Sequence, residues 1–214
     1  MFTGIVTHIG RVRRVAPTGK GGVRIEIAAP FDTGALAVGA SVACAGCCLT
    51  VVEKGPDWFA AQASGETMAV TTLGGWREGT AVNLERPLKA GDELGGHYVS
   101  GHVDGVGRVA AREQAGDSLR LAFAVPARLG RFVARKGSVA VDGVSLTVNA
   151  VADRGAGTTF WVNVIPHTAA ATTLGALGRG DRVNVEIDML ARYGARLAEA
   201  AKPAGGAKRK RRKA

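Results

Sequence analysis

Short runs in which hydrophobic and polar residues alternate cover most of the chain, and turns that contain glycine separate them roughly every ten residues. Residues 23–27, 41–44 and 160–164 each show this period of two, which places every second side chain on the same face of a strand. Many short strands at this spacing predict an all-β fold in the form of a small antiparallel barrel. Brief helical turns are predicted at residues 67–72 and 126–135.

An internal repeat sets the domain organisation. Residues 1–12 align with 98–109, and residues 41–51 align with 138–148, both at an offset of 97. Four extra residues in the second copy then move the offset to 101, at which 71–74 and 82–85 align with 172–175 and 183–186. We therefore predict two tandem barrels, at residues 1–97 and 98–188.

A helical period appears only near the end of the chain. Leu190, Tyr193, Leu197 and Ala201 fall on one face of a helix, so residues 189–201 are predicted to form an amphipathic α-helix. This helix has no partner within its own repeat, and we expect it to associate with other subunits. At the other end, the repeat begins with the first residues, which leaves no room for a cleavable signal and predicts a cytoplasmic protein.

The net charge of +10 is concentrated in the last residues. Seven of the 28 basic residues lie in 202–214, which leaves 21 basic against 18 acidic residues in 1–201. The tail has no apolar period and is typical of a disordered, solubilising segment, with contact to a nucleic acid or an acidic surface as the alternative. A nearly neutral body with 5% aromatic residues argues against a nucleic-acid-binding barrel. No apolar run approaches the roughly 18 residues of a membrane-spanning helix.

All three cysteines, Cys44, Cys47 and Cys48, lie within five residues of one another. This arrangement offers no disulfide framework, and reduced thiols are the expectation in the cytoplasm. A zinc site at Cys44 and Cys47 would need a second pair of ligands, which the four histidines do not supply at metal spacing. We therefore expect no metal.

Four segments carry a family resemblance: 1–6 (MFTGIV), 46–51 (GCCLTV), 95–102 (GGHYVSGH) and 142–148 (DGVSLTV). On these motifs the chain resembles the riboflavin synthases from its first residue to about Leu197. The resemblance implies two six-stranded antiparallel Greek-key barrels, each binding one 6,7-dimethyl-8-ribityllumazine. It also implies a reaction without a cofactor, in which one lumazine gives a four-carbon unit to another, yielding riboflavin and 5-amino-6-(D-ribitylamino)uracil. In that family the C-terminal helices hold a homotrimer, and the active site forms between the N-terminal barrel of one subunit and the C-terminal barrel of its neighbour.

Transfer between two identical molecules needs two similar pockets with unlike polar groups. The unlike pairs in the repeat are Ile5 and His102, Ala45 and Asp142, Cys48 and Ser145, Glu66 and His167, and Pro87 and Asp188. We hypothesise that His102, Ser145 and Asp188, assisted by Thr147, exchange protons in the C-terminal barrel, and that Cys48 polarises or adds to the ring in the N-terminal barrel.

Each of these residues also has a structural interpretation. Cys48 could be a buried small residue, and Ser145 and Thr147 share one face of a strand, where satisfied hydroxyls are common. Asp142 precedes a glycine in a turn, and Asp188 could cap the helix that follows it. His97 lies in the linker, where a structural role is expected.

The resemblance also implies the residues that bind the two ligands. For the N-terminal barrel they are Gly4, Ile5, Val6, Cys48, Leu49, Thr50, Gln62, Ala63, Ser64, Gly65, Glu66 and Thr67. For the C-terminal barrel they are Gly101, His102, Val103, Lys136, Ser145, Leu146, Thr147, Asn163, Val164, Ile165, Pro166, His167 and Thr168. Polar side chains among them suit the hydroxyls of a ribityl chain. The main alternative is a lumazine- or flavin-binding carrier of the same fold, which would need only one working barrel.

Overall fold

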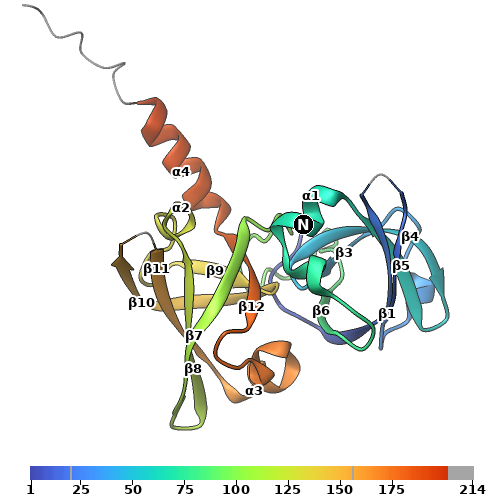
Figure 1. The fold of residues 1–214 in the computed structure, drawn as a ribbon, viewed down its shortest axis with the longest axis horizontal. Coiled ribbons are helices and arrows are strands. Elements are labelled where there is room, and N and C mark those ends of the chain that lie inside the picture. The colour runs from blue at the N-terminus through green and yellow to red at the C-terminus, as the bar shows by residue number, and fades with distance from the viewer. Residues whose placement is uncertain (20, 156, 202–214) are drawn as a thin grey trace, which may run out of the picture.

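The computed structural model describes residues 1–19, 21–155 and 157–201, and Figure 1 shows its two barrels side by side. The strands of the N-terminal barrel are β1 (His8–Pro17), β2 (Val23–Ala28), β3 (Ser41–Cys44), β4 (Cys47–Gly55), β5 (Trp58–Ala63) and β6 (Ala81–Glu85). They pair antiparallel in the order β1-β2-β5-β4-β3-β6 and close through β6 and β1. The connection from β2 to β3 skips two strands, as in a Greek key.

The C-terminal barrel repeats this topology. Its strands are β7 (Gly105–Ala115), β8 (Ser118–Pro126), β9 (Ser138–Val141), β10 (Val144–Arg154), β11 (Gly157–Val164) and β12 (Arg182–Ile187), closed in the equivalent order β10-β11-β8-β7-β12-β9. Register shifts follow Val12 and Val51 in the first barrel, and Val109 and Val148 at the matched positions of the second. Such bulges bend a strand, which lets six short strands close. The predicted tandem of six-stranded barrels is confirmed.

Side chains fill the inside of each barrel. Ile25, Phe59 and Leu84 are fully buried in the first core, and Phe123 and Phe160 pack together in the second with ring centroids 5.5 Å apart. Alternation places one face of every strand in these cores and leaves the other face outside. The packed cores therefore leave the outside of the barrels as the surface that can bind a ligand.

Short helical segments connect the strands. They are η1 (Thr33–Ala35), α1 (Gly65–Val70), η2 (Thr72–Gly75), α2 (Ala127–Gly130), α3 (Pro166–Ala171) and η3 (Thr173–Ala176). The turn predicted at 67–72 overlaps α1. The turn predicted at 126–135 ends at Gly130, where the backbone approaches Thr158 so closely that a Cβ would clash, and Lys136 then takes a positive φ of 67°. After α2 the chain continues in turns, with hydrogen bonds from the Phe132 N–H to the Leu129 carbonyl and from the Val133 N–H to the Gly130 carbonyl.

The predicted C-terminal helix is α4 (Met189–Ala200), which extends away from the barrels (Figure 1). The Asp188 carboxylate caps it by accepting a hydrogen bond from the Leu190 N–H at 2.9 Å. Leu190, Tyr193 and Leu197 are 69%, 63% and 72% exposed, so the chain does not cover its apolar stripe. No helix in the described ranges is long and apolar enough to cross a membrane. The predicted tail at 202–214 lies outside the described residues.

Two asparagines lock the barrels together. In the N-terminal barrel, the Asn83 side-chain amide donates to the Asp142 carbonyl at 2.9 Å and accepts from the Thr173 N–H at 2.8 Å. Asn184, its counterpart in the C-terminal barrel, makes the mirror-image bonds with the Ala45 carbonyl at 2.8 Å and the Thr72 N–H at 2.7 Å. The contacts between the barrels therefore follow the repeat, because each copy binds the equivalent turns of the other.

Candidate functional site

The segment before each barrel crosses to the other barrel. Gly4, ahead of β1, accepts a hydrogen bond from the Ser145 N–H of β10 at 2.8 Å. Gly101, ahead of β7, accepts one from the Cys48 N–H of β4 at 2.8 Å. Both glycines have positive φ, and a Cβ on either would come within 2.6 Å of the partner's Cβ. Glycine is needed at both positions because no side chain fits this approach.

This exchange corrects the grouping expected from the sequence. Gly4, Ile5 and Val6 were assigned to the N-terminal barrel with Cys48, but Gly4 lies against Ser145 and Val6 packs on the core of the C-terminal barrel. Conversely, Gly101 lies against Cys48 and Val103 packs on the core of the N-terminal barrel. The repeat alignment identifies equivalent residues, but it does not reveal which barrel each segment contacts.

One group of predicted residues gathers around Cys48. A pocket of about 220 Å³ is lined by Cys48, Glu66, Thr67, His102 and Val103, together with Cys47, Val70, Thr71 and Gly101. A second pocket, of about 610 Å³, is also lined by Cys48 and His102 and reaches Met189, Arg192 and Tyr193 of α4. We call the residues Cys48, Glu66, Thr67, Gly101, His102 and Val103 the Cys48 half-site.

Cys48 differs from its neighbouring cysteines in accessibility. All three thiols are free, but Cys44 and Cys47 are buried whereas Cys48 is only partly buried. Burial raises the pKa of the Cys47 thiol to about 12 and that of Cys44 well above its usual value. Since the thiolate is the reactive form, Cys48 is the cysteine best placed for chemistry.

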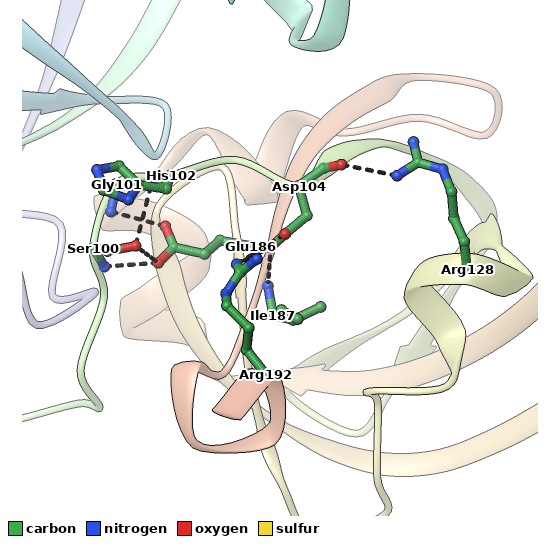
Figure 2. A network of polar contacts seen from close by, with 8 residues as sticks. All are labelled: Ser100, Gly101, His102, Asp104, Arg128, Glu186, Ile187 and Arg192. Carbon is green, nitrogen blue, oxygen red and sulfur yellow. Dashed lines mark hydrogen bonds and ion pairs between the residues drawn. The ribbon is translucent and has the colours of Figure 1, made fainter. Parts of the chain in front are cut away.

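A carboxylate holds the segment that carries His102 (Figure 2). Glu186 of β12 accepts hydrogen bonds from the Ser100 N–H at 2.7 Å, the Ser100 hydroxyl at 2.6 Å and the Gly101 N–H at 2.9 Å. The Ser100 hydroxyl oxygen in turn accepts from the His102 N–H at 3.3 Å. The backbone just before His102 is therefore fixed, while its side chain remains exposed.

A second anchor lies two residues after His102. The Asp104 carboxylate accepts from the Ile187 N–H at 2.9 Å and pairs with the Arg192 guanidinium at 2.8 Å (Figure 2). The Asp104 carbonyl also accepts from Arg128 at 3.2 Å. Arg192 belongs to the first turns of α4, so the C-terminal helix is tied directly to the His102 segment.

The first half of the chain has an equivalent of the Glu186 contacts but not of the Asp104–Arg192 ion pair. Glu85 accepts from the Thr3 N–H at 2.6 Å, the Thr3 hydroxyl at 2.8 Å and the Gly4 N–H at 3.0 Å. Burial raises the pKa of Glu85, and these donors oppose the rise. Thr7 stands at the position that corresponds to Asp104, so no acidic side chain is available there for a second anchor.

Ser145 has a histidine partner that the sequence analysis missed. The His97 Nδ1 lies 2.7 Å from the Ser145 Oγ, and the His97 N–H donates to the Thr3 carbonyl at 3.1 Å. The His97 Nε2 is buried and has no hydrogen-bond partner among the described residues. Burial lowers the His97 pKa, and the charges of Asp188 and Glu186 oppose that effect. We call Gly4, His97 and Ser145, with the outward-facing Thr147, the Ser145 half-site.

His97 directly precedes the second copy of the repeat and lies outside the aligned blocks. Its place within the 95–102 motif was the signal available in the sequence. Within one chain the structure does not bring the predicted trio of His102, Ser145 and Asp188 together: His102 lines the Cys48 pockets, His97 contacts Ser145, and the Asp188 carboxylate caps α4.

The remaining predicted binding residues divide by which way they face. Thr50 and Gln62 are directly paired across β4 and β5 and point outward, as do Thr147 and Asn163 in the second barrel. Side chains that instead face the cores are those of Leu49, Ala63, Leu146 and Val164. These four can offer a ligand only their main chain. Exposed residues outside the strands are Ser64, Gly65, Lys136, Ile165, Pro166 and His167, with Thr168 partly exposed.

Asp142 serves the contact between the barrels. It forms a turn with a positive φ of 45° and accepts a hydrogen bond from the Asn184 N–H at 2.8 Å through its carboxylate. Burial raises its pKa to about 7. Asp142 therefore has the turn-forming role considered for it from the sequence, and its turn lies at the contact between the barrels that Asn83 and Asn184 stabilise.

Comparison with known proteins agrees with this organisation. The family model described as the lumazine binding domain matches residues 3–87 and again 100–188. The chain is 48% identical over 204 residues to the riboflavin synthase of Brucella abortus, covering 93% of this chain and 98% of that protein. It is 42% identical over 208 residues to the riboflavin synthase of Mycobacterium tuberculosis strain H37Rv, covering 94% and 100%.

Solved structures of a protein named LumP are also similar. The complex with 6,7-dimethyl-8-(1'-D-ribityl) lumazine aligns with a TM-score of 0.76 at 26% identity, covering 87% of this chain and 98% of that one. The riboflavin complex aligns with a TM-score of 0.79 over 87% and 99% of the two chains. The family match covers most of the chain, and the relatives align over nearly their whole length. The chain therefore belongs to the riboflavin synthase family, with one lumazine binding domain in each half.

Proposed function

We propose that this protein is a transferase that dismutates two molecules of 6,7-dimethyl-8-ribityllumazine. One molecule gives up a four-carbon unit and leaves as 5-amino-6-(D-ribitylamino)uracil, and the other receives the unit and becomes riboflavin. The observation that carries the proposal is a pair of matched half-sites with unlike reactive groups: Cys48 with His102, and Ser145 with His97. Extensive identity to proteins named riboflavin synthase supports it.

The shared features of the half-sites suit what the two substrates have in common. In each, a glycine segment lies along a strand of the other barrel, and an outward threonine, Thr50 or Thr147, stands two residues beyond the reactive side chain. The groups that differ suit opposite roles, because donor and acceptor need different proton transfers.

Each half-site is assigned its own ligand contacts. The ligand of the Cys48 half-site is assigned residues 48–50, 62–67 and 101–103. The ligand of the Ser145 half-site is assigned residues 4–6, 145–147 and 163–168. Lys136 stays a candidate ligand contact.

The uncovered face of α4 supports assembly. Three large apolar side chains on one helix are more than 60% exposed, and an exposed apolar stripe is typical of a face that packs on another chain. We assign this face to a homotrimer in which the N-terminal barrel of one subunit meets the C-terminal barrel of its neighbour. We place the protein in the cytoplasm, where its three free thiols would stay reduced.

The direct test is to mix the purified protein with 6,7-dimethyl-8-ribityllumazine alone, without added metal or cofactor, and to follow riboflavin by absorbance. One riboflavin formed per two lumazines consumed is the expected result. Sedimentation of the same sample gives the number of subunits, and a monomer that turns over would refute the trimeric site.

A carrier that binds a lumazine or a flavin is the second candidate. The structural likeness to LumP in complex with lumazine and with riboflavin favours it. Tight binding without turnover in the same assay would establish the carrier and reject the transferase.

A further inference from the structure

His97 and Ser145 form a close pair at the Ser145 half-site. The 2.7 Å separation of Nδ1 and Oγ is that of a short hydrogen bond. The pair is held on both sides: the His97 N–H is bonded to the Thr3 carbonyl, and the Ser145 N–H to the Gly4 carbonyl. Gly96 packs so closely on Ser145 that a Cβ there would lie 2.9 Å from the Ser145 Cβ. The contacts with Thr3 and Gly4 thus hold the imidazole and the hydroxyl next to each other.

The surroundings of the ring favour its neutral form. Burial disfavours the imidazolium and lowers the His97 pKa, although the carboxylates of Asp188 and Glu186 partly offset this effect. A neutral ring whose Nδ1 accepts the serine hydrogen carries its own hydrogen on Nε2. That Nε2 is buried without a partner in the described part of the chain. A buried donor without an acceptor is uncommon in proteins, and a catalytic role is one recognised reason for such a group.

We propose that His97 is the base that activates Ser145 toward the pteridine ring bound at the Ser145 half-site. The inference rests on the proposed function. As the Ser145 oxygen bonds to an electrophilic C=N carbon of the ring, its proton passes to the His97 Nδ1, and the π-electron pair moves onto the ring nitrogen. Reversal returns the proton to the oxygen and expels the serine, so the step needs no oxidant or reductant. His97 acts through Ser145 and is a positioning and proton-accepting residue.

A test that does not require turnover uses the variant Ser145→Cys. Histidine next to a thiol promotes the thiolate, which iodoacetamide alkylates. We expect the introduced thiol to react at pH 7 about 10-fold faster with His97 present than in Ser145→Cys/His97→Asn. Asparagine can still hydrogen-bond at the Nδ1 position but does not accept a proton. Tryptic peptides separate position 145 from Cys48, whose alkylation in the same sample serves as the internal reference for the two forms of residue 97. For variants at residue 102 the rate at position 145 is compared directly with that of Ser145→Cys at the same reagent concentration.

The matched control is Ser145→Cys/His102→Asn. His102 lines the Cys48 pockets, so its replacement should leave the reactivity of the introduced thiol unchanged. Equal alkylation rates with and without His97 would overturn the proposal. So would an equal loss of rate on replacing His102.

Kinetics of the full-length protein test the same step in the reaction. His97→Asn should lower kcat about 100-fold or more while the riboflavin dissociation constant and Tm stay near those of the parent. In a Ser145→Ala background the same substitution should have little further effect, because the two residues act as one unit. An Asn variant that keeps kcat within a few-fold would reduce His97 to a hydrogen-bond partner and overturn the proposal. A parent protein without turnover would refute the proposed function, whereas the alkylation result would still decide the role of His97.

Discussion

The two halves of the chain share a scaffold down to individual hydrogen bonds, yet their half-sites differ. Glu85 and Glu186 hold the crossing segments with the same three kinds of donor, and Gly4 and Gly101 meet the opposite barrels in the same way. On the ligand face the two halves differ, with Cys48 near His102 in one half-site and Ser145 next to His97 in the other. The two copies thus share the frame and differ in these reactive side chains.

Replacing Phe2 should have the largest effect on stability, because this large buried side chain stands where the second copy of the repeat has the smaller Val99. Phe2 is 0% exposed and pairs with Val99, its counterpart in the repeat, between Ala43 and Ala140 of the two barrels. We expect Phe2→Ala to cost about 3–5 kcal/mol in the free energy of unfolding. Val99→Ala removes fewer buried atoms and should cost less. Urea unfolding of both variants checks this, and equal losses would contradict the central role assigned to the aromatic ring.

The second prediction concerns Asp142. Ala45 stands at the equivalent position in the first copy of the repeat, so only one of these two matched turns carries a titrating group. Burial raises its pKa from 3.8 to about 7, so between these values the folded protein binds more protons than the unfolded chain. The contribution of this group to stability is present at low pH and is lost as pH rises from about 4 to 7, by up to about 4 kcal/mol.

Asp142→Asn removes this titration and can still accept the hydrogen bond from the Asn184 N–H. The variant should therefore gain stability relative to the parent between pH 4 and pH 8, measured by urea unfolding at each pH. A constant difference across that range would show that Asp142 does not carry a raised pKa.

The third prediction tests the exchange of segments. Gly101→Ala places a Cβ 2.5 Å from that of Cys48, and Gly4→Ala places one 2.6 Å from that of Ser145. Added to the positive φ, each clash should cost about 1–3 kcal/mol. Gly101→Ala should raise the alkylation rate of Cys48, whereas Gly4→Ala should not. If Gly4→Ala exposed Cys48 instead, the grouping first inferred from the repeat would be right.

The sequence predicted the barrels well because alternation and the repeat register are local signals that burial enforces. Cys48, Ser145, Gly4 and Gly101 were named as site residues from their motifs. Their partners were not predictable, because an alignment of two copies is the same whether a segment folds back on its own barrel or crosses to the other. His97 was expected to be structural for a related reason: it lies outside the aligned blocks, where comparing the two copies offers no contrast to interpret.

The smallest expected effect concerns the anchor that only the second half possesses. The Asp104 and Arg192 side chains are 11% and 42% exposed and pair at 2.8 Å, so solvent screens part of the attraction, and Arg192→Ala should cost about 1 kcal/mol or less. Its effect on the His102 segment should nevertheless be specific, because Asp104 would lose its tie to α4 and retain only the Ile187 N–H. We expect a fall in kcat of a few-fold with Tm almost unchanged. Arg196→Ala is the matched control, since this arginine lies one turn later on α4, is 77% exposed and forms an ion pair with Glu199 of the same helix. If both variants lowered kcat equally, the effect would belong to the helix as a whole, and the ion pair would not be what positions His102.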